Sequence, residues 1–372
     1  MKYYLIAGEA SGDLHGANLL KALKRIDPQA SFRCWGGDLM QNAGGELVKH
    51  YRELAFMGFT EVLMNLGTIF KNIRYCKKDI ELFNPDVIIF IDYPGFNLRI
   101  AKWARQKKYR THYYISPQIW AWKEGRIKRI KKDIDAMYVI LPFEKDFYEK
   151  KNQFPVHFVG HPLIDAISNR AQVNPQLFKK EQGWDDRPII ALLPGSRKQE
   201  ISKMLEVMLS TVDNFSDYQF VIAGAPSQDI DFYRPFIQDQ NVHLLLNNTY
   251  DLLSISYAAI VTSGTATLET ALFKVPQVVC YKGSRISYEI AKRVIKLKYI
   301  SLVNLILDKK VVTELIQAEF NKENLIDELS IILDPYKRAT LFLEYYDLEK
   351  RLGGKGASKK TAKLIYKAIS IP

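Results

Sequence analysis

The residues whose types and spacing could carry chemistry lie in short turns that follow apolar runs. The most informative turn follows the run 259–261, and its residues carry neither bulk nor charge. If a helix begins there, its first backbone N–H groups lack partners and face an anion, with the helix dipole behind them. The pattern predicts a phosphate site made by Ser263, Gly264, Thr265, Ala266 and Thr267.

A second turn of this kind follows the apolar run 189–193. Gly195 permits close backbone approach, while Ser196 and Arg197 supply a hydroxyl and a guanidinium suited to phosphate oxygens. Neither turn has the glycine spacing of a P-loop or of a dinucleotide fingerprint. Two phosphate-seeking turns in one half of the chain indicate a nucleoside diphosphate ligand.

Asp92 is the candidate catalytic carboxylate. It directly follows the apolar run 87–91, and Pro94-Gly95 forces a turn just after it. A partly desolvated carboxylate at the end of a buried strand can act as a general base towards a hydroxyl. The alternative is a loop cap. The sequence shows neither a serine-nucleophile elbow nor a Cys/His pair to compete with it.

The turn after the first apolar run, 3–7, is a further candidate site. In a doubly wound sheet ligands bind at this point, glycines permit tight geometry, and the polar residues supply contacts. The alternative role for Asp13 is to cap the following helix. The predicted contacts in this turn are Gly8, Glu9, Ser11, Gly12 and Asp13.

Two later segments add candidates on the same side. The loop 113–122 is dense in aromatics, and Trp120 could stack on a sugar or an acyl chain, or pack in the core. His161 follows Gly160 in a turn after the run 156–159. The remaining histidines, His15, His50, His112, His157 and His243, show no metal-like spacing, so we expect no metal site.

The elements that must position these residues alternate between apolar runs and amphipathic segments. Fully apolar runs of about five residues are typical of parallel strands covered on both faces. We predict an α/β fold with two Rossmann-like, doubly wound parallel-sheet domains facing a central cleft. The expected domains are residues 1–170, completed by a C-terminal helix at about 345–372, and residues 171–344. The expected strands are 3–7, 87–91, 113–115, 136–140, 156–159, 188–193, 219–223, 242–245, 259–261 and 277–281.

Two surface features bear on location. The segment 54–70 is apolar. It is either an amphipathic element that contacts a bilayer or acyl chains, or a buried pair of helices. The basic run 123–132 is either a solvated helix face or a contact with an anionic membrane, worth roughly 1 kcal/mol per residue near the surface. The predicted contacts are Phe56, Met57, Phe59, Leu63, Met64, Phe70, Lys128, Arg129 and Lys132.

Composition narrows the class of protein. The 372 residues suffice for two domains, and 53 Lys+Arg against 41 Asp+Glu give a net charge of +12, which attracts polyanions. Three widely spaced cysteines fit a reducing compartment, and no apolar run fits a signal peptide or a membrane span. We expect a cytoplasmic protein.

Six blocks in order, 7–13, 91–97, 116–122, 160–163, 193–197 and 263–269, make the chain resemble the lipid-A-disaccharide synthase family from residue 3 to about 317. The resemblance implies a GT-B fold and an inverting hexosyltransferase without metal or cofactor. Such an enzyme moves diacylglucosamine from UDP-diacylglucosamine to the primary hydroxyl of diacylglucosamine phosphate (lipid X). The products are UDP and the β-linked disaccharide of lipid A, a component of lipopolysaccharide in Gram-negative outer membranes.

The resemblance also implies roles for individual residues. Asp92 would deprotonate the acceptor, Ser196 and Arg197 would hold the pyrophosphate with the helix start at 263–267, and Glu269 would meet the ribose. Asn304 and Gln317 match downstream polar positions of the donor site. Many relatives carry a second Asp where this chain has Gly95, so Asp92 would act alone.

The implied partners are the two lipid substrates and the anionic inner-membrane surface, where the protein would be peripherally bound. Relatives can form dimers by exchanging C-terminal segments, so a homodimer is one expected state. The nearest alternative is another GT-B-like UDP-sugar enzyme, either a hexosamine epimerase or a peptidoglycan-type transferase. A basic nucleic-acid-binding protein is a rival from another class, although no nucleic-acid module is recognisable and we expect no nucleic-acid partner. A third alternative is a sugar-nucleotide-binding scaffold that has lost its activity.

Overall fold

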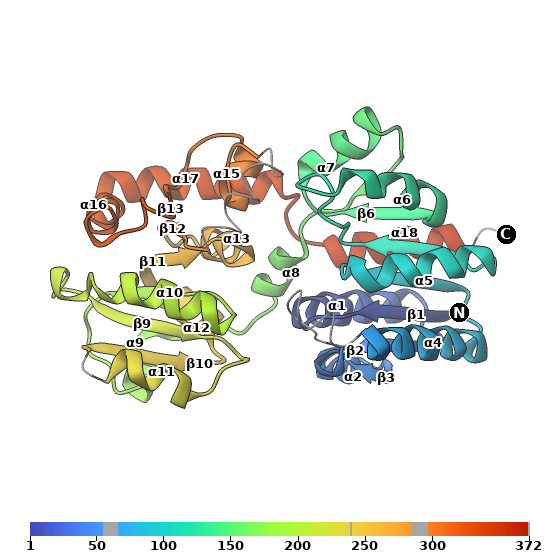
Figure 1. Cartoon of the computed structure of the whole chain (residues 1–372), viewed down its shortest axis with the longest axis horizontal. Helices are drawn as coiled ribbons and strands as arrows, with labels where there is room; N and C mark the ends of the chain where they lie inside the picture. The colour runs from blue at the N-terminus through green and yellow to red at the C-terminus, as the bar shows by residue number, and fades with distance from the viewer. Residues whose placement is uncertain (55–65, 239, 284–296, 371–372) are drawn as a thin grey trace. The chain divides into compact units, whose positions relative to one another are not determined.

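The computed structural model describes residues 1–54, 66–238, 240–283 and 297–370. The chain divides into two compact units (Figure 1). Unit 1 comprises Met1–Ser168 and the segment that begins at Leu352, and unit 2 comprises Asn169–Arg351. The boundary lies close to the expected one after residue 170. Unit 2 ends later than residue 344, because one unbroken helix, α17 (Pro335–Arg351), packs on α15 (Leu302–Leu307) and α16 (Lys322–Leu333) of the same unit.

Unit 1 is built on a parallel sheet with strand order β3-β2-β1-β4-β5-β6-β7. The order reverses between β1 and β4, so the turns after these two strands are neighbours at a switch point where ligands bind. Every residue of β4 is buried. The strands are β1 (Lys2–Ala7), β2 (Ser31–Gly36), β3 (Glu46–His50), β4 (Val87–Ile91), β5 (Thr111–Tyr114), β6 (Ala136–Val139) and β7 (His157–Phe158).

Helices cover this sheet, and the late segment supplies one of them, since α18 packs against α1 and α8. The helices of unit 1 are α1 (Ala10–Ile26), α2 (Asp38–Asn42), η1 (Tyr51–Glu53), α4 (Leu66–Phe83), α5 (Pro94–Gln106), η2 (Glu124–Arg126), α6 (Ile127–Asp133), α7 (Pro142–Asp146), η3 (Phe147–Lys151), α8 (Pro162–Ser168) and α18 (Ala357–Ser370).

Unit 2 repeats the architecture with strand order β10-β9-β8-β11-β12-β13, again all parallel. Its switch point lies between β8 and β11, so the two predicted phosphate turns are neighbours. The strands are β8 (Ile189–Leu193), β9 (Gln219–Gly224), β10 (Val242–Leu246), β11 (Ser256–Thr262), β12 (Gln277–Tyr281) and β13 (Glu314–Ile316). Besides α17, the helices are α9 (Pro175–Glu181), α10 (Lys198–Leu209), η4 (Val212–Asn214), α11 (Ile230–Ile237), α12 (Thr249–Ile255), α13 (Thr265–Leu272), α15 (Leu302–Leu307) and α16 (Lys322–Leu333).

The predicted fold class of two doubly wound parallel-sheet domains is confirmed. The prediction omitted β2, β3 and β13. Polar residues interrupt β2, β3 is only partly buried, and β13 has three residues, so none of them has the fully apolar pattern. Among the described helices, none is both long enough and apolar enough to cross a membrane.

Candidate active site

The switch point of unit 1 brings the first turn against the Asp92 turn. Ala7 and Ile91 are register partners at the ends of β1 and β4. The Tyr93 ring lies over Gly8 so closely that a Cβ there would be 2.3 Å from Tyr93 Cδ1. Gly8 is therefore needed to accommodate the residue that follows Asp92.

The backbone of Asp92 is held in an unusual conformation. Asp92 and Tyr93 both have positive φ, 44° and 50°, which costs on the order of 1 kcal/mol or more for each residue. The Asp92 carbonyl oxygen accepts hydrogen bonds from the Tyr113 hydroxyl at 2.6 Å and from Asn97 Nδ2 at 2.7 Å. Both donors are fully buried. Sequence reasoning gave neither residue a role, although Asn97 stands in the same sequence block.

The Asp92 side chain is only partly exposed, and its pKa is raised to about 7. Burial is the main cause, followed by the Glu9 charge and, more weakly, the Glu144 charge, while a hydrogen bond from the Tyr93 backbone opposes the shift. A carboxyl that titrates near neutrality is matched to general-base chemistry.

The other first-turn residues differ in accessibility. Glu9 and Ser11 are exposed at the start of α1, and Gly12 lies against Ala7, where a Cβ would be 3.0 Å from the Ala7 Cβ. Asp13 is buried, and its carboxylate accepts from the backbone N–H groups of Gly37, Leu39 and Met40. It thus caps α2 rather than its own helix, and its oxygens are engaged within the protein.

Glu144 organises the aromatic loop and was missed from the sequence. Its Oε1 accepts from Ser116 Oγ at 2.6 Å and from Trp120 Nε1 at 3.2 Å, and its Oε2 accepts from two backbone N–H groups. Burial raises the pKa of this carboxyl. Trp120 is partly exposed with its indole N–H oriented by Glu144, so the ring can face a ligand. The Pro142-Phe143-Glu144 helix start was the available signal.

His161 lies in the core rather than on an open surface. Its Nδ1 accepts from the Leu163 N–H at 3.2 Å, and the backbone N–H of His161 donates to the Leu352 carbonyl at 2.9 Å. Burial, aided by nearby His15, lowers the pKa of His161 to about 3. The backbone of His161 thus helps to hold the segment that begins at Leu352, while the neutral imidazole is buried and is not presented to an acceptor.

In unit 2, the turn after β8 is open at its tip. Ser196 and Arg197 are exposed, and no acidic side chain of the described residues pairs with Arg197. Glu200 Oε2 accepts from the Ser196 N–H at 3.1 Å and lies over Gly195, whose φ is 108°. The guanidinium is free for an anion, while Glu200 occupies the Ser196 amide.

The neighbouring turn starts α13 as predicted. Gly264 and Thr265 are exposed, and within the described part of the chain no side chain caps this helix. Thr267 Oγ1 donates to the Gly264 carbonyl at 2.8 Å, and Ser263 Oγ donates to the Ile300 carbonyl at 3.1 Å. Ala266 is partly buried. The small side chains shape the turn and leave its first backbone N–H groups as the donors towards an anion.

Glu269 lies on α13 and contacts Tyr250, which lines a cavity of about 270 Å³. Its Oε1 accepts from the Tyr250 hydroxyl at 2.7 Å, and burial raises the pKa of the carboxyl. Tyr250 also lines the cavity, together with Pro226, Asn247, Asn248, Thr249 and Asp251. The cavity follows the ends of β9 and β10, on the same side of the sheet as both phosphate turns.

The two downstream polar residues differ. Asn304 is fully buried, and its amide makes four hydrogen bonds, to the Glu314 carboxylate and to the backbone of Val311 and Val312. It is therefore a structural residue with no free group for a ligand. Gln317, with a φ of 54°, has a buried Nε2 without a hydrogen-bond partner among the described residues. That donor is available to a ligand.

The predicted membrane contacts are only partly described. Phe56, Met57, Phe59, Leu63 and Met64 lie outside the described residues. Phe70 on α4 is 58% exposed, while Ile73, Cys76 and Ile80 on the same helix are buried. Lys128, Arg129 and Lys132 are exposed on α6. Within the described ranges, no three His, Cys, Asp or Glu residues gather as metal ligands do.

Comparison with known proteins decides the family. The model of the family described as lipid-A-disaccharide synthetase matches residues 3–365. A lipid-A-disaccharide synthase of Coxiella burnetii (strain CbuG_Q212) is 38% identical, with 98% of each chain covered. That of Syntrophus aciditrophicus (strain SB) is 39% identical, covering 96% of this chain and 95% of the relative. The chain belongs to the lipid-A-disaccharide synthase family. The predicted family and enzyme class, a glycosyltransferase, are thereby confirmed.

Solved structures show the fold at greater distance. A UDP-GlcNAc 2-epimerase from Neisseria meningitidis bound to UDP-GlcNAc has a TM-score of 0.71 at 14% identity, with 99% of this chain and 100% of that chain covered. The calicheamicin glycosyltransferase CalG4 has a TM-score of 0.61 at 14% identity, with 100% and 99% covered. These likenesses confirm the GT-B architecture of this lipid-A-disaccharide synthase family member.

Proposed function

We propose that this chain transfers the diacylglucosamine unit of UDP-diacylglucosamine to the primary hydroxyl of diacylglucosamine phosphate. The observation that carries the proposal is Asp92, a carboxyl with a pKa near 7 at the switch point of a family member. Asp92 takes the hydroxyl proton as the oxygen attacks the anomeric carbon from the face opposite UDP. The bond from that carbon to the pyrophosphate oxygen breaks, and the β-linked disaccharide and UDP result.

Unit 2 holds the donor in this proposal. Arg197 and the first N–H groups of α13 stabilise the negative charge that develops on the departing pyrophosphate. The Glu269 oxygen that Tyr250 leaves free accepts from a ribose hydroxyl, and the cavity beside Tyr250 receives the uracil. Gln317 Nε2 is a further donor to the nucleotide. Ser196 contributes its hydroxyl, because Glu200 already holds its amide.

A transfer assay tests the reaction directly. Purified protein would be given both lipid substrates in neutral detergent with EDTA. Disaccharide plus UDP supports the proposed reaction without metal, whereas rescue by an added divalent cation contradicts the metal-free mechanism. A free epimer in place of disaccharide favours the epimerase alternative. UDP binding without any product would direct the search to other acceptors.

Replacing Asp92 tests its role as the base. Asp92→Asn keeps the shape of the side chain but cannot take a proton, so turnover should fall by about 10²–10⁴. Affinity for UDP, measured by calorimetry, should not change. Asp146→Asn, an exposed carboxylate paired with Lys150, is the control and should retain full activity. Parallel losses of turnover and UDP affinity in Asp92→Asn would contradict a base role.

Replacing Arg197 tests the pyrophosphate site. Arg197→Ala removes charge-assisted hydrogen bonds, so UDP should bind roughly 10–100-fold more weakly. Uridine, which has no phosphate, should bind as before. Lys203→Ala, at an exposed position of α10, the helix that follows Arg197, should alter neither affinity. Unchanged UDP affinity in Arg197→Ala would remove this residue from the site.

Location and assembly complete the proposal. The protein would act from the cytoplasm, bound peripherally to the anionic inner membrane through α6 and the exposed Phe70 side of α4. It would serve lipid A synthesis for the outer membrane, and a homodimer is one state in which it would do so.

A further inference from the structure

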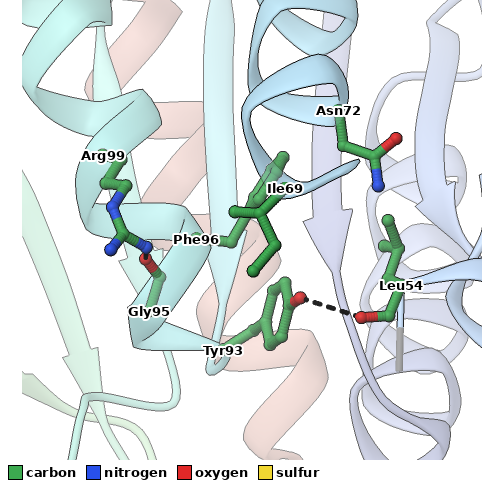
Figure 2. A pocket seen from close by; sticks show the side chains of 7 residues that line it. All are labelled: Leu54, Ile69, Asn72, Tyr93, Gly95, Phe96 and Arg99. Carbon is green, nitrogen blue, oxygen red and sulfur yellow. Dashed lines mark hydrogen bonds between the residues drawn. The ribbon is translucent and has the colours of Figure 1, made fainter. Parts of the chain in front are cut away.

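A pocket opens beside the catalytic turn (Figure 2). It measures about 170 Å³, and Leu54, Ile69, Tyr93 and Phe96 supply most of its wall. Tyr93 is the residue that follows Asp92, so the pocket adjoins the proposed base. Figure 2 shows Ile69, Phe96 and Tyr93 close together, with Arg99 to one side. An apolar hollow with a cationic rim fits an acyl chain that carries an anionic headgroup.

Three guanidiniums lie together beyond this rim. Arg99 donates to the Gly95 carbonyl within the pocket lining. Arg129 on α6 donates to the carbonyl of Leu98, the neighbour of Arg99, at 3.1 Å. Arg126 is half-buried in η2, just before α6. The pKa of Arg126 is lowered by burial and by the charges of Arg129 and Arg99, so both of these guanidiniums lie within electrostatic reach of Arg126.

This arginine cluster lacks acidic partners. Among the ion pairs of the described residues, none involves Arg99, Arg126 or Arg129. The acidic residue nearest to Arg126 in the sequence, Glu124, pairs instead with Lys151 at 2.7 Å. Holding three like charges together without an anion is unfavourable, and clustered guanidiniums are suited to phosphate.

The cluster also reaches the catalytic turn. Arg126 lies close enough to Tyr113 for each to influence the pKa of the other, and the Tyr113 hydroxyl donates to the Asp92 carbonyl at 2.6 Å. The apolar pocket adjoins the same turn through Tyr93. An anionic group on the arginines and an alkyl chain in the pocket would therefore both lie beside Asp92, as two parts of one ligand.

We propose that Arg99, Arg126 and Arg129 bind the phosphomonoester of a phosphorylated acyl lipid whose acyl chain enters the pocket beside Asp92. The inference rests on the proposed function, in which such a lipid is the acceptor. It assigns Arg129 to substrate rather than to the membrane surface alone. It also makes the phosphate a determinant of acceptor specificity.

Equilibrium binding without any UDP-sugar tests the arginines. Diacylglucosamine phosphate and its dephosphorylated form would be titrated in neutral-detergent micelles. Arg126→Gln and Arg129→Gln should weaken binding of the phosphorylated lipid about tenfold or more, and leave the dephosphorylated lipid unaffected. Lys131→Gln, an exposed charge on the same helix, should change neither. Arg126→Lys keeps the charge, so it should recover part of the lost affinity. That recovery would exclude a folding defect as the cause of the loss.

The pocket has its own test. Gly95 lines the pocket, and a Cβ there would meet no atom within 4 Å, so Gly95→Leu adds a bulky side chain at the pocket wall without a clash at its Cβ. It should weaken binding of the diacylated phosphate but not of glucosamine phosphate. Gly67→Leu, at an equally open glycine outside the pocket, is the control. Equal effects on both ligands, or inorganic phosphate binding as tightly as the lipid, would overturn the acyl part.

Two further outcomes are decisive. Arginine variants that bind the phosphorylated lipid normally in micelles, but bind anionic vesicles poorly, would make the cluster a membrane contact and overturn the inference. If wild-type protein binds the phosphorylated lipid through these arginines and yet forms no disaccharide, the proposed function fails and the lipid site stands. If transfer proceeds and the arginine variants retain acceptor affinity, the inferred lipid site is wrong and the proposed function stands.

Discussion

At the scale of single residues, Asp92 sits where its side chain and its backbone are both under constraint. Burial, and next to it the Glu9 charge, disfavour the ionised form of this carboxyl and raise its pKa to about 7. The two left-handed residues store strain that Tyr113 and Asn97 hold in place through the Asp92 carbonyl. These hydrogen bonds fix the backbone of Asp92 and leave its carboxylate oxygens out of these contacts.

The raised pKa predicts a pH dependence of activity. Because the base must be deprotonated, kcat/KM for the acceptor should rise with pH through a midpoint of about 7. Glu9→Gln removes a negative charge that raises this pKa, so the midpoint should move to lower pH, by up to about one unit. Ser11→Ala, a neutral change in the same turn, should leave the profile in place. Superimposable profiles for wild type and Glu9→Gln would contradict the coupling.

The candidate site could be predicted only in part. Asp92 and the Ser196-Arg197 turn follow fully apolar five-residue runs, and the turn 263–267 follows a shorter one, so local pattern suffices to place these residues at strand ends. Their supports could not be found in this way, because Tyr113 and Glu144 act on residues more than twenty positions away. Asn304 shows the opposite error, since its block matches the family while its amide is committed to internal hydrogen bonds.

At the scale of elements, α18 is fastened to unit 1 by groups distant in sequence. The Asp165 carboxylate on α8 accepts from the backbone N–H groups of Gly356 at 2.6 Å and Ser358 at 3.0 Å. It thus caps the start of a helix that begins almost two hundred residues later. Arg110 donates to the Ile369 carbonyl near the other end of α18. The helical pattern of the C-terminal segment predicted a helix at about 345–372, but not the residues that cap α18 (Ala357–Ser370).

Removing the distant cap should loosen α18. Asp165→Ala leaves two N–H groups without their acceptor, so unit 1 should lose about 1–2 kcal/mol of stability. Thermal unfolding and limited proteolysis after residue 351 would measure this. Asp347→Ala breaks an exposed pair with Arg351 on α17 and should cost at most about 1 kcal/mol. Equal effects of the two substitutions would show that the cap contributes little.

At the scale of the whole molecule, the net charge of +12 favours approach to any anionic surface. In the proposed function, such long-range attraction would bring the protein to a membrane that holds acylated substrates, and it would weaken as salt screens the charges. The exposed lysines of α6 and the exposed Phe70 of α4 offer separate electrostatic and apolar contributions. Salt distinguishes these two contributions.

Vesicle binding should therefore depend on salt. Raising ionic strength from about 0.1 M to about 1 M shortens the Debye length from about 10 Å to about 3 Å, so the protein should leave vesicles that contain anionic lipid. A Lys128→Gln/Lys132→Gln variant should bind them more weakly at low salt, by roughly fivefold per residue. A Lys322→Gln/Lys337→Gln variant, with charges removed from unit 2, is the control. Binding that ignores salt would assign the contact to apolar side chains such as Phe70.

The division of unit 1 into two stretches of sequence has a consequence for biosynthesis. The ribosome makes the first stretch up to Ser168, then the whole of unit 2, and only then the residues from Leu352 that form α18. At roughly 5–20 residues per second, the nascent first stretch waits roughly 10–40 s for its last helix. During that interval, the face of α1 that α18 will cover is open to chaperones and to neighbouring nascent chains. Unit 2, continuous in sequence, can finish folding first.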